Sequence, residues 1–307
     1  MQSFRTGNKI VRFIDSNLEE VVRQTLDKTT GDITYQDMSR LRFLTASNQG
    51  ISNLSGLEYA VNLQYLDLSN NQITDIEPLS NLTTLEELNL IENQITDVKP
   101  LAKLTGLKKL FLTHNQIKDI GPLANLIALK VLTIVGNQIT DITPLANLTN
   151  LQRLRLSRNQ ITNIEPLSKL TKLRELRLIG NQITNIEPLA NLTNLQELHL
   201  DGNQITDIEP LSNLTKLQEL RLVGNQITDI TPLAKLTNLL FVNLSNNEID
   251  DISTLVDNSG LRSGIRVDLT HNRLDLREGS YDVRNIKILE RMGVVVNYEP
   301  QNGETKN

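Results

Sequence analysis

One 22-residue unit repeats without insertion or deletion from Leu63 to Asn238, and it constrains the fold more than any other feature of the chain. Its consensus is LxxLxLxxNQITDIxPLxNLTx, and a looser copy stands on each side of the regular ones. The segment LxxLxL is too short for a helix and alternates as a β-strand does. Units of this kind are expected to stack, each burying its leucines against its neighbours. The first leucines of the regular copies are Leu63, Leu85, Leu107, Leu129, Leu151, Leu173, Leu195 and Leu217.

An asparagine follows each predicted strand, and a proline marks the return path. Because an asparagine amide both donates and accepts, a buried column of asparagines can satisfy turn backbone groups that water cannot reach. Eight of the nine prolines occupy one repeat position, which favours the first position of a helical turn. The PLxNL segment therefore predicts a short 3₁₀ or α turn.

These features predict an α/β fold of the leucine-rich repeat type. We expect a right-handed solenoid, shaped as a horseshoe or arc, with a parallel β-sheet on its concave face and short turns on its convex face. The expected parts are a helical N-terminal cap at residues 1–40, a solenoid of about eleven coils at 41–276, and a C-terminal cap at 277–307 made of a helix and a final strand.

The N-terminal cap is expected to hold two helices that cover the open end of the sheet. Asp15 is a predicted N-cap, and Thr34 with Asp37 predicts a capping box. The polar turn between the helices also suggests an EF-hand calcium loop. If Gly31 took the sixth position of such a loop, Leu26 would take the first, and no glutamate would close it. We therefore expect a structural cap without a metal.

The unit NQITDIxPLxNLTxLxxLxL, the start IDSNLEEVVRQTL and the ending GVVVNYEP resemble the bacterial leucine-rich repeats of the internalin family over about residues 10–300. The resemblance implies a secreted or wall-attached surface protein that binds partner proteins through its concave face. The chain departs from secreted members because it shows no signal peptide, wall-anchor motif or immunoglobulin-like segment. As written, it is expected to be soluble and cytoplasmic, or extracellular or at the cell surface if it is trimmed from a longer protein.

Composition and spacing exclude several classes of function. A net charge of −5 and a pI of about 5.4 argue against a nucleic-acid-binding protein, and no apolar run is long enough to enter a membrane as a helix. The three histidines fall on different coils: His114, His199 and His271. No two of them are therefore expected to bind one metal ion. No Ser–His–Asp set is expected to converge either. We expect a monomer that is not an enzyme and has no metal or cofactor.

The positions that differ between repeats are those free for recognition, and here they are the outward positions of the predicted strands. One group is apolar and lies on three neighbouring coils: Ile91, Phe111, Val131 and Val135. The other group is charged: Arg153, Arg155, Glu175, Arg177, His199 and Arg221. Both predict a concave face that binds a protein or peptide without catalysis. The alternative is a structural spacer, or a consensus-like or engineered scaffold, with no specific ligand.

Overall fold

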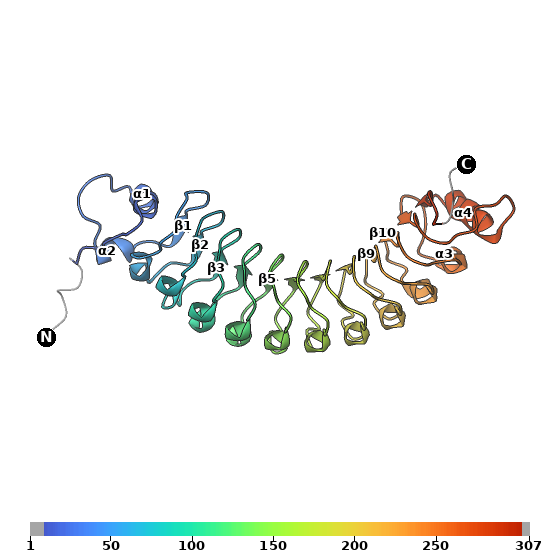
Figure 1. Cartoon of the computed structure of the whole chain (residues 1–307), viewed down its shortest axis with the longest axis horizontal. Helices are drawn as coiled ribbons and strands as arrows, with labels where there is room; N and C mark the ends of the chain where they lie inside the picture. Colours follow the sequence, from blue (N-terminus) through green and yellow to red (C-terminus); the bar gives the residue numbers. More distant parts are fainter. Residues whose placement is uncertain (1–8, 303–307) are drawn as a thin grey trace. The chain divides into compact units, whose positions relative to one another are not determined.

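The computed structural model describes residues 9–302, and the chain divides into two compact units, Met1–Leu151 and Gln152–Asn307. Each unit is a stack of coils, and each coil carries a three-residue strand and a tight return turn (Figure 1). The strands of the first unit are β1 (Phe43–Thr45), β2 (Tyr65–Asp67), β3 (Glu87–Asn89), β4 (Lys109–Phe111) and β5 (Val131–Thr133). Those of the second are β6 (Arg153–Arg155), β7 (Glu175–Arg177), β8 (Glu197–His199), β9 (Glu219–Arg221), β10 (Phe241–Asn243), β11 (Arg266–Asp268) and β12 (Val295–Asn297).

Within each unit the strands pair in chain order, and every pair is parallel. Equivalent positions of successive repeats are therefore direct neighbours, as Leu88 and Leu110 are. Leu88 and Leu90 are fully buried, as the alternation predicts. Burial of one such leucine stabilises the fold by roughly 1.5–3 kcal/mol, and the same positions are buried in coil after coil. The predicted α/β leucine-rich repeat solenoid is thus confirmed.

The proline-containing segments form 3₁₀ turns, also as predicted. Each buries its leucine, and an Asp or Asn side chain just before the turn accepts a hydrogen bond from the backbone, for example Asp75 Oδ1 from the amide of Glu77 at 2.8 Å. The proline turns are η2 (Glu77–Leu79), η3 (Lys99–Lys103), η4 (Gly121–Asn125), η5 (Thr143–Leu145), η6 (Glu165–Leu167), η7 (Glu187–Leu189), η8 (Glu209–Leu211) and η9 (Thr231–Lys235). The first coil has a 3₁₀ turn without a proline, η1 (Leu57–Tyr59). In the next coil, where Thr254 replaces proline, a short α-helix α3 (Ser253–Asp257) forms instead.

The asparagine column is a ladder in which each side chain serves its own coil and the coil before it. Asn181 donates through Nδ2 to the carbonyls of Leu178 at 3.0 Å and Leu156 at 3.1 Å. Its Oδ1 accepts from the amide of Ile161 at 3.0 Å. These backbone groups are buried and would otherwise lack partners, so the ladder replaces the water that cannot enter the turn.

Gln301 ends this ladder at the C-terminal side. Its Oε1 accepts from the amides of Asn272 and Leu274, each at 3.1 Å, and its Nε2 donates to the carbonyl of Leu269 at 3.0 Å. A ladder asparagine makes the same set of bonds to the preceding coil, as Asn71 does to Gln49, Ile51 and Ala46. Gln301 is 5% exposed. It therefore takes the place of the asparagine that a further repeat would supply.

The N-terminal helices are α1 (Ser16–Thr25) and α2 (Tyr35–Met38). Asp15 caps α1 as predicted, accepting from the amides of Asn17 and Leu18. The Thr34–Asp37 capping box is present at α2, and Lys28 Nζ lies 2.7 Å from the Asp37 carboxylate. The Asp37 side chain is thus committed to the cap.

At the other end, helix α4 (Tyr281–Arg291) follows the N-cap Ser280 and packs on β12. The apolar spacing of this helix in the sequence predicts that Val283, Ile286 and Leu289 point inward. Ile286 and Leu289 are buried, but the third buried residue is Asp282, and Val283 is only partly buried. The reason is that Asp282 Oδ2 accepts from the backbone amide of Asp275 at 2.9 Å, which draws that side chain inward. Within the described residues, every helix is too short or too polar to cross a lipid bilayer.

Candidate functional site

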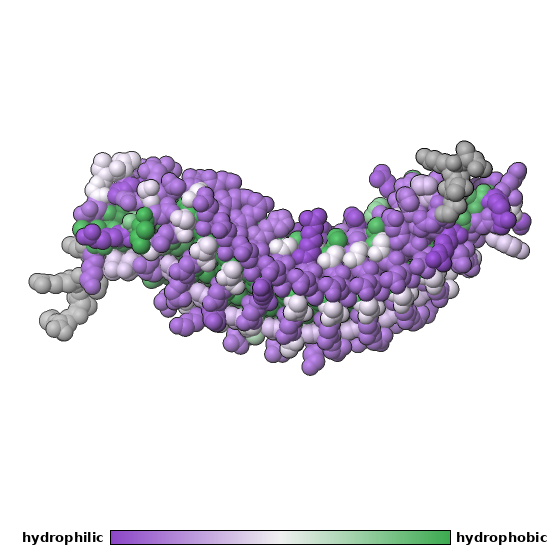
Figure 2. Space-filling model, in the orientation of Figure 1, coloured by the Kyte–Doolittle hydropathy of each residue, from purple (hydrophilic) through white to green (hydrophobic). Residues whose placement is uncertain are grey.

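The strand face is the set of outward side chains on the strands and on the residue two positions after each strand. Hydrophilic side chains dominate the view of both units in Figure 2, with apolar atoms also visible near the N-terminal helices. The strand face of the first unit carries the predicted apolar group, whose members are all partly exposed: Ile91, Phe111, Val131 and Val135. Register places Phe111 between Asn89 and Thr133, and Val131 beside Lys109. With strands about 4.8 Å apart, the group spans roughly 10 Å.

Polar contacts border this apolar group on two sides. On one side, Lys109 Nζ lies 2.9 Å from Glu87 Oε2, and these two residues are the first of β4 and β3. On the other side, His114 Nδ1 lies 3.7 Å from Glu92 Oε1, and Glu92 directly follows Ile91 in the chain. Partly exposed apolar side chains with a charged rim have the composition of a protein interface.

Phe43 on β1 is a strand-face aromatic that the sequence reasoning missed. Its side chain is 63% exposed, and it pairs in register with Tyr65 on β2. It also lines a pocket of about 350 Å³ together with Leu26, Arg42 and their neighbours. The signal was present, because Phe43 precedes Tyr65 by one repeat length. It lies, however, in the looser copy before Leu63, outside the regular repeats that give the predicted outward positions.

The charged group of the second unit centres on Glu175. Its carboxylate is approached by the Nε atoms of Arg155 at 2.7 Å, Arg177 at 2.8 Å and Arg153 at 3.7 Å. Burial by itself raises the pKa of Glu175, but the hydrogen bond from Arg155 and the charges of Arg155, Arg177 and Arg153 outweigh it and hold the pKa below its usual value. Register sets Arg155 beside Arg177, and the glutamate neutralises a contact between like charges that would otherwise be costly.

The same arginines cover Glu175 and leave it only 6% exposed, whereas the side chain of Arg153 is 63% exposed. Glu175 was expected on an accessible face, and its burial removes it from direct contact with a partner. Arg153, Arg155 and Arg177 provide the accessible surface instead.

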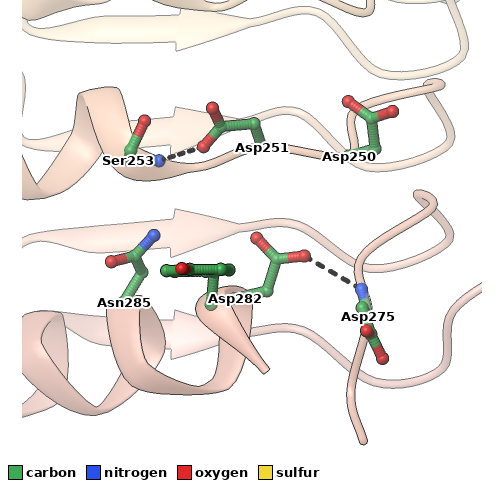
Figure 3. A pocket seen from close by; sticks show the side chains of 7 residues that line it. Asp250, Asp251, Ser253, Asp275, Asp282 and Asn285 are labelled. Carbon is green, nitrogen blue, oxygen red and sulfur yellow. Dashed lines mark hydrogen bonds between the residues drawn. The ribbon is translucent and has the colours of Figure 1, made fainter. Parts of the chain in front are cut away.

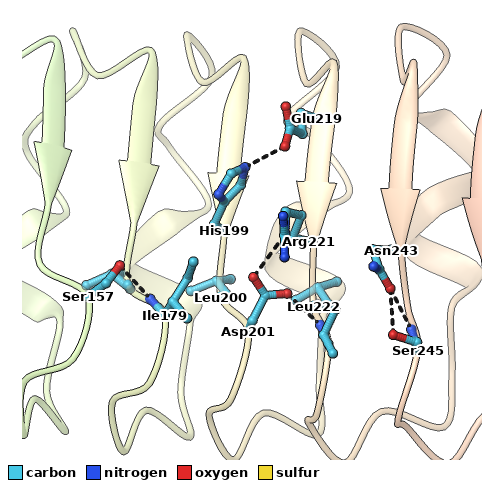
Figure 4. Close-up of polar contacts among 12 residues, drawn as sticks. Ser157, Ile179, His199, Leu200, Asp201, Glu219, Arg221, Leu222, Asn243 and Ser245 are labelled. Atoms are coloured by element: carbon cyan, nitrogen blue, oxygen red, sulfur yellow. Dashed lines mark hydrogen bonds and ion pairs between the residues drawn. The ribbon is translucent and has the colours of Figure 1, made fainter. Parts of the chain in front are cut away.

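His199 is also buried, at 4% exposure, although it too was expected on the accessible face. Its Nε2 atom lies 2.9 Å from Glu219 Oε1, and the neighbouring Arg221 Nε lies 3.1 Å from Asp201 Oδ2 (Figure 4). Burial lowers the pKa of His199, and the positive charge of Arg177 lowers it further. The imidazole is therefore neutral at neutral pH.

The C-terminal coils hold an acidic pocket of about 510 Å³ that the sequence reasoning did not predict (Figure 3). It is lined by Asp250, Asp251, Ser253, Asp275, Tyr281, Asp282 and Asn285. Three of these carboxylates accept backbone hydrogen bonds: Asp251 from Ser253 at 2.8 Å, Asp282 from Asp275 at 2.9 Å and Asp275 from Arg277 at 3.0 Å. Burial raises the pKa of Asp282, and the nearby aspartates add to the rise. The Asp282 bond ties helix α4 to the segment that follows β11.

One group with metal-ligating chemistry converges within residues 9–302: Glu197, His199 and Glu219, whose ligand atoms lie within 4.8 Å of one another. It contains a single histidine, in line with the prediction that the histidines lie on separate coils. The spacing of the histidines does not reveal this group, because its carboxylates come from the strand of His199 itself and from the next strand.

The repeats match a known family. The family described as Leucine Rich repeats (2 copies) matches overlapping segments that run from residue 39 to residue 257. No curated protein matches the chain.

Solved structures are similar over most of the chain. An internalin, InlF, from Listeria monocytogenes is 34% identical, with 96% of each chain covered and a TM-score of 0.79. Internalin C2 from the same organism is 40% identical over 75% of this chain and 93% of its own, with a TM-score of 0.57. A leucine-rich repeat protein of Leptospira interrogans is 30% identical over 80% of this chain and 63% of its own, with a TM-score of 0.72.

Leucine-rich repeat proteins generally serve protein interaction, and the internalin-like fold is a non-catalytic scaffold for it. With these repeats over most of its length and an internalin 34% identical along 96% of it, the chain belongs to the bacterial leucine-rich repeat proteins of the internalin family.

Proposed function

We propose that the chain is a non-catalytic module that binds a protein or peptide through its strand face. The observation that carries the proposal is the contrast between the two sides of each repeat. The turn side is nearly copied from coil to coil, while the strand face differs in every coil and carries partly exposed apolar residues in the first unit. The division into caps at 1–40 and 277–307 and a solenoid at 41–276 remains a prediction.

Phe111 is the proposed main contact of the first unit. It stands on a strand whose backbone is fixed by β3 and β5, so its side chain loses little entropy on binding. Ile91, Val131 and Val135 extend the apolar surface to either side of it. Phe43 adds a second, more exposed aromatic near the N-terminal cap.

The second unit is proposed to contribute charge. Arg153, Arg155, Arg177 and Arg221 expose between 32% and 63% of their side chains, and each also contacts a carboxylate. Because these charges are already partly neutralised, they chiefly set orientation and association rate. Glu175 holds Arg155 and Arg177 in place and contributes indirectly.

The proposal is tested by selecting peptides against the purified chain from a displayed library and measuring their affinity by calorimetry. Phe111→Ala is expected to weaken binding by about 1–3 kcal/mol. Arg153→Ala is the cleaner charge variant, because its contact with Glu175 is the longest of the three, and its smaller effect is expected to shrink as salt is added.

Glu165→Ala and Lys169→Ala are the matched controls, since both residues are exposed on the turn side of the second unit. They are expected to leave affinity unchanged. Loss of binding in these variants, together with normal binding by Phe111→Ala, would show that the strand face is not the binding surface.

A structural spacer is the second candidate function, and the uninterrupted 22-residue period favours it. A spacer requires regular coils and no recognition surface. It predicts that selection yields no peptide whose binding depends on a strand-face residue.

A further inference from the structure

The side chains of Glu197, His199 and Glu219 converge on one point of the strand face of the second unit. Glu197 and His199 lie two positions apart on β8 and so point to the same side of the sheet, and Glu219 is the register partner of Glu197 on β9. Neighbouring strands are about 4.8 Å apart, and residues two positions apart on one strand are separated by about 6.6 Å. Both spacings lie within reach of two glutamates and an imidazole, and the ligand atoms lie within 4.8 Å of one another.

The Nε2 atom of His199 has no hydrogen-bond partner among the described residues. It lies 2.9 Å from Glu219 Oε1, but the contact does not have the alignment of a hydrogen bond. A buried polar atom without a partner is costly, and His199 is only 4% exposed.

The charges around this point are unevenly distributed. Glu175 is approached by three arginines, and Arg221 is engaged by Asp201. Glu197 shares Arg177 with Glu175, at 3.3 Å from the guanidinium. Among the ion pairs of the described residues, Glu219 is matched only with His199, which is neutral. Negative charge therefore remains unanswered beside an imidazole nitrogen that makes no hydrogen bond.

We propose that Glu197, His199 and Glu219 form a binding site for a divalent transition metal ion of the zinc type. The ion takes Nε2 of His199 and one carboxylate oxygen from each glutamate, and it replaces the direct contact between His199 and Glu219. Three nitrogen and oxygen ligands suit Zn²⁺, whereas Ca²⁺ and Mg²⁺ prefer six or more oxygens. The glutamate side chains are 40% and 36% exposed, so water reaches the ion and completes its coordination.

Arg177 opposes the ion in this arrangement. Its guanidinium contacts Glu197 and contributes to the lowered pKa of His199, so the same charge that keeps the imidazole neutral also repels a cation. The site is therefore expected to bind more tightly when Arg177 is replaced by glutamine.

The experiment is a calorimetric titration of the full chain, without an affinity tag, with ZnCl₂ in a buffer that does not bind metal. One ion per chain is expected, and Co²⁺ is expected to give visible absorption bands of low coordination number. Glu219→Gln and Glu197→Gln should each weaken Zn²⁺ affinity by at least about 10-fold, and Arg177→Gln should strengthen it. His199→Ala should abolish binding.

His114→Ala is the matched control, because His114 is exposed and contacts a glutamate on another coil. Circular dichroism without metal checks that each variant folds. If His199→Ala does not fold, the two glutamate variants still test the proposal. The proposal is overturned if the chain shows no saturable binding of one Zn²⁺. It is equally overturned if both glutamate variants bind as the unaltered chain does. Peptide binding by the strand face is measured separately and depends on neither result.

Discussion

Gln301→Ala is expected to destabilise the C-terminal coils far more than any surface substitution. The side chain makes three hydrogen bonds of 3.0–3.1 Å to backbone groups of Leu269, Asn272 and Leu274, and a further one to the carbonyl of Tyr298. Alanine removes all of them at once and leaves buried backbone groups without partners.

The expected loss follows from counting these bonds. A hydrogen bond to a buried backbone group contributes about 1 kcal/mol net, and an unsatisfied partner costs more. Water can enter part of the vacated space at the end of the stack. The free energy of unfolding of the C-terminal coils should therefore fall by about 2–4 kcal/mol. The stability of Gln301→Asn should lie between that of the unaltered chain and that of Gln301→Ala, since the asparagine amide is one methylene short of the same partners.

Urea unfolding followed by circular dichroism measures the change in stability. Since stacked repeats can fray from one end, amide hydrogen exchange gives the more direct measurement. The amides of Asn272 and Leu274 should lose protection in Gln301→Ala.

Gln49→Ala is the matched control at the opposite end of the ladder. Gln49 occupies the asparagine position of the first coil, but its exposed side chain donates only to the carbonyl of Ser47. Its replacement should change stability by less than about 0.5 kcal/mol. Equal losses in the two variants, or unchanged exchange at Leu274, would refute the interpretation of Gln301 as the terminal member of the ladder.

Three further predictions concern carboxylates with shifted pKa values. Because the folded state raises the pKa of Asp282, its charged form costs stability at neutral pH; Asp282→Asn should raise the melting temperature at pH 7, and the gain should vanish as the pH falls toward about 4. For Asp37, burial is outweighed by the hydrogen bonds from Lys28 and Thr34, which lower the pKa to about 2. Asp37→Asn should therefore reduce thermal stability above about pH 4, and its difference from the unaltered chain should close as the pH falls toward 2. The pKa of Glu175 is likewise lowered, so Glu175→Gln should destabilise the second unit at neutral pH and match the unaltered chain in strong acid, as followed by circular dichroism.

The sequence predicted the fold almost completely, because the repeat determines it locally. Leu88 and Leu90 point inward through strand alternation alone, and the Asp75 and Asn181 hydrogen bonds follow from what those side chains can donate or accept at fixed positions. The caps were less predictable. Asp282 is buried by one backbone contact with Asp275, and no repeat pattern encodes that contact.

The sequence predicted which residues lie on the strand face, but not how exposed their side chains are. Repeat arithmetic placed Glu175 and His199 on the strand face, yet it could not show that long arginine side chains on neighbouring coils would cover Glu175. Side-chain direction on a sheet is set by alternation, whereas exposure depends on which neighbours fold over the surface. The convergence of His199 with Glu219 likewise depends on rotamers, which spacing does not specify.

The direction of the asparagine ladder bears on how the protein folds during synthesis. Within each unit, the buried backbone groups of one coil are satisfied by a side chain that comes about 20–25 residues later in the chain, as Ile161 and Leu156 are by Asn181. A chain that leaves the ribosome N-terminus first therefore always carries one unfinished coil at its growing end. Each new repeat completes the preceding coil and exposes another incomplete one. The coil of Leu274 stays incomplete until residue 301 emerges, because Gln301 supplies the acceptor for its backbone amide.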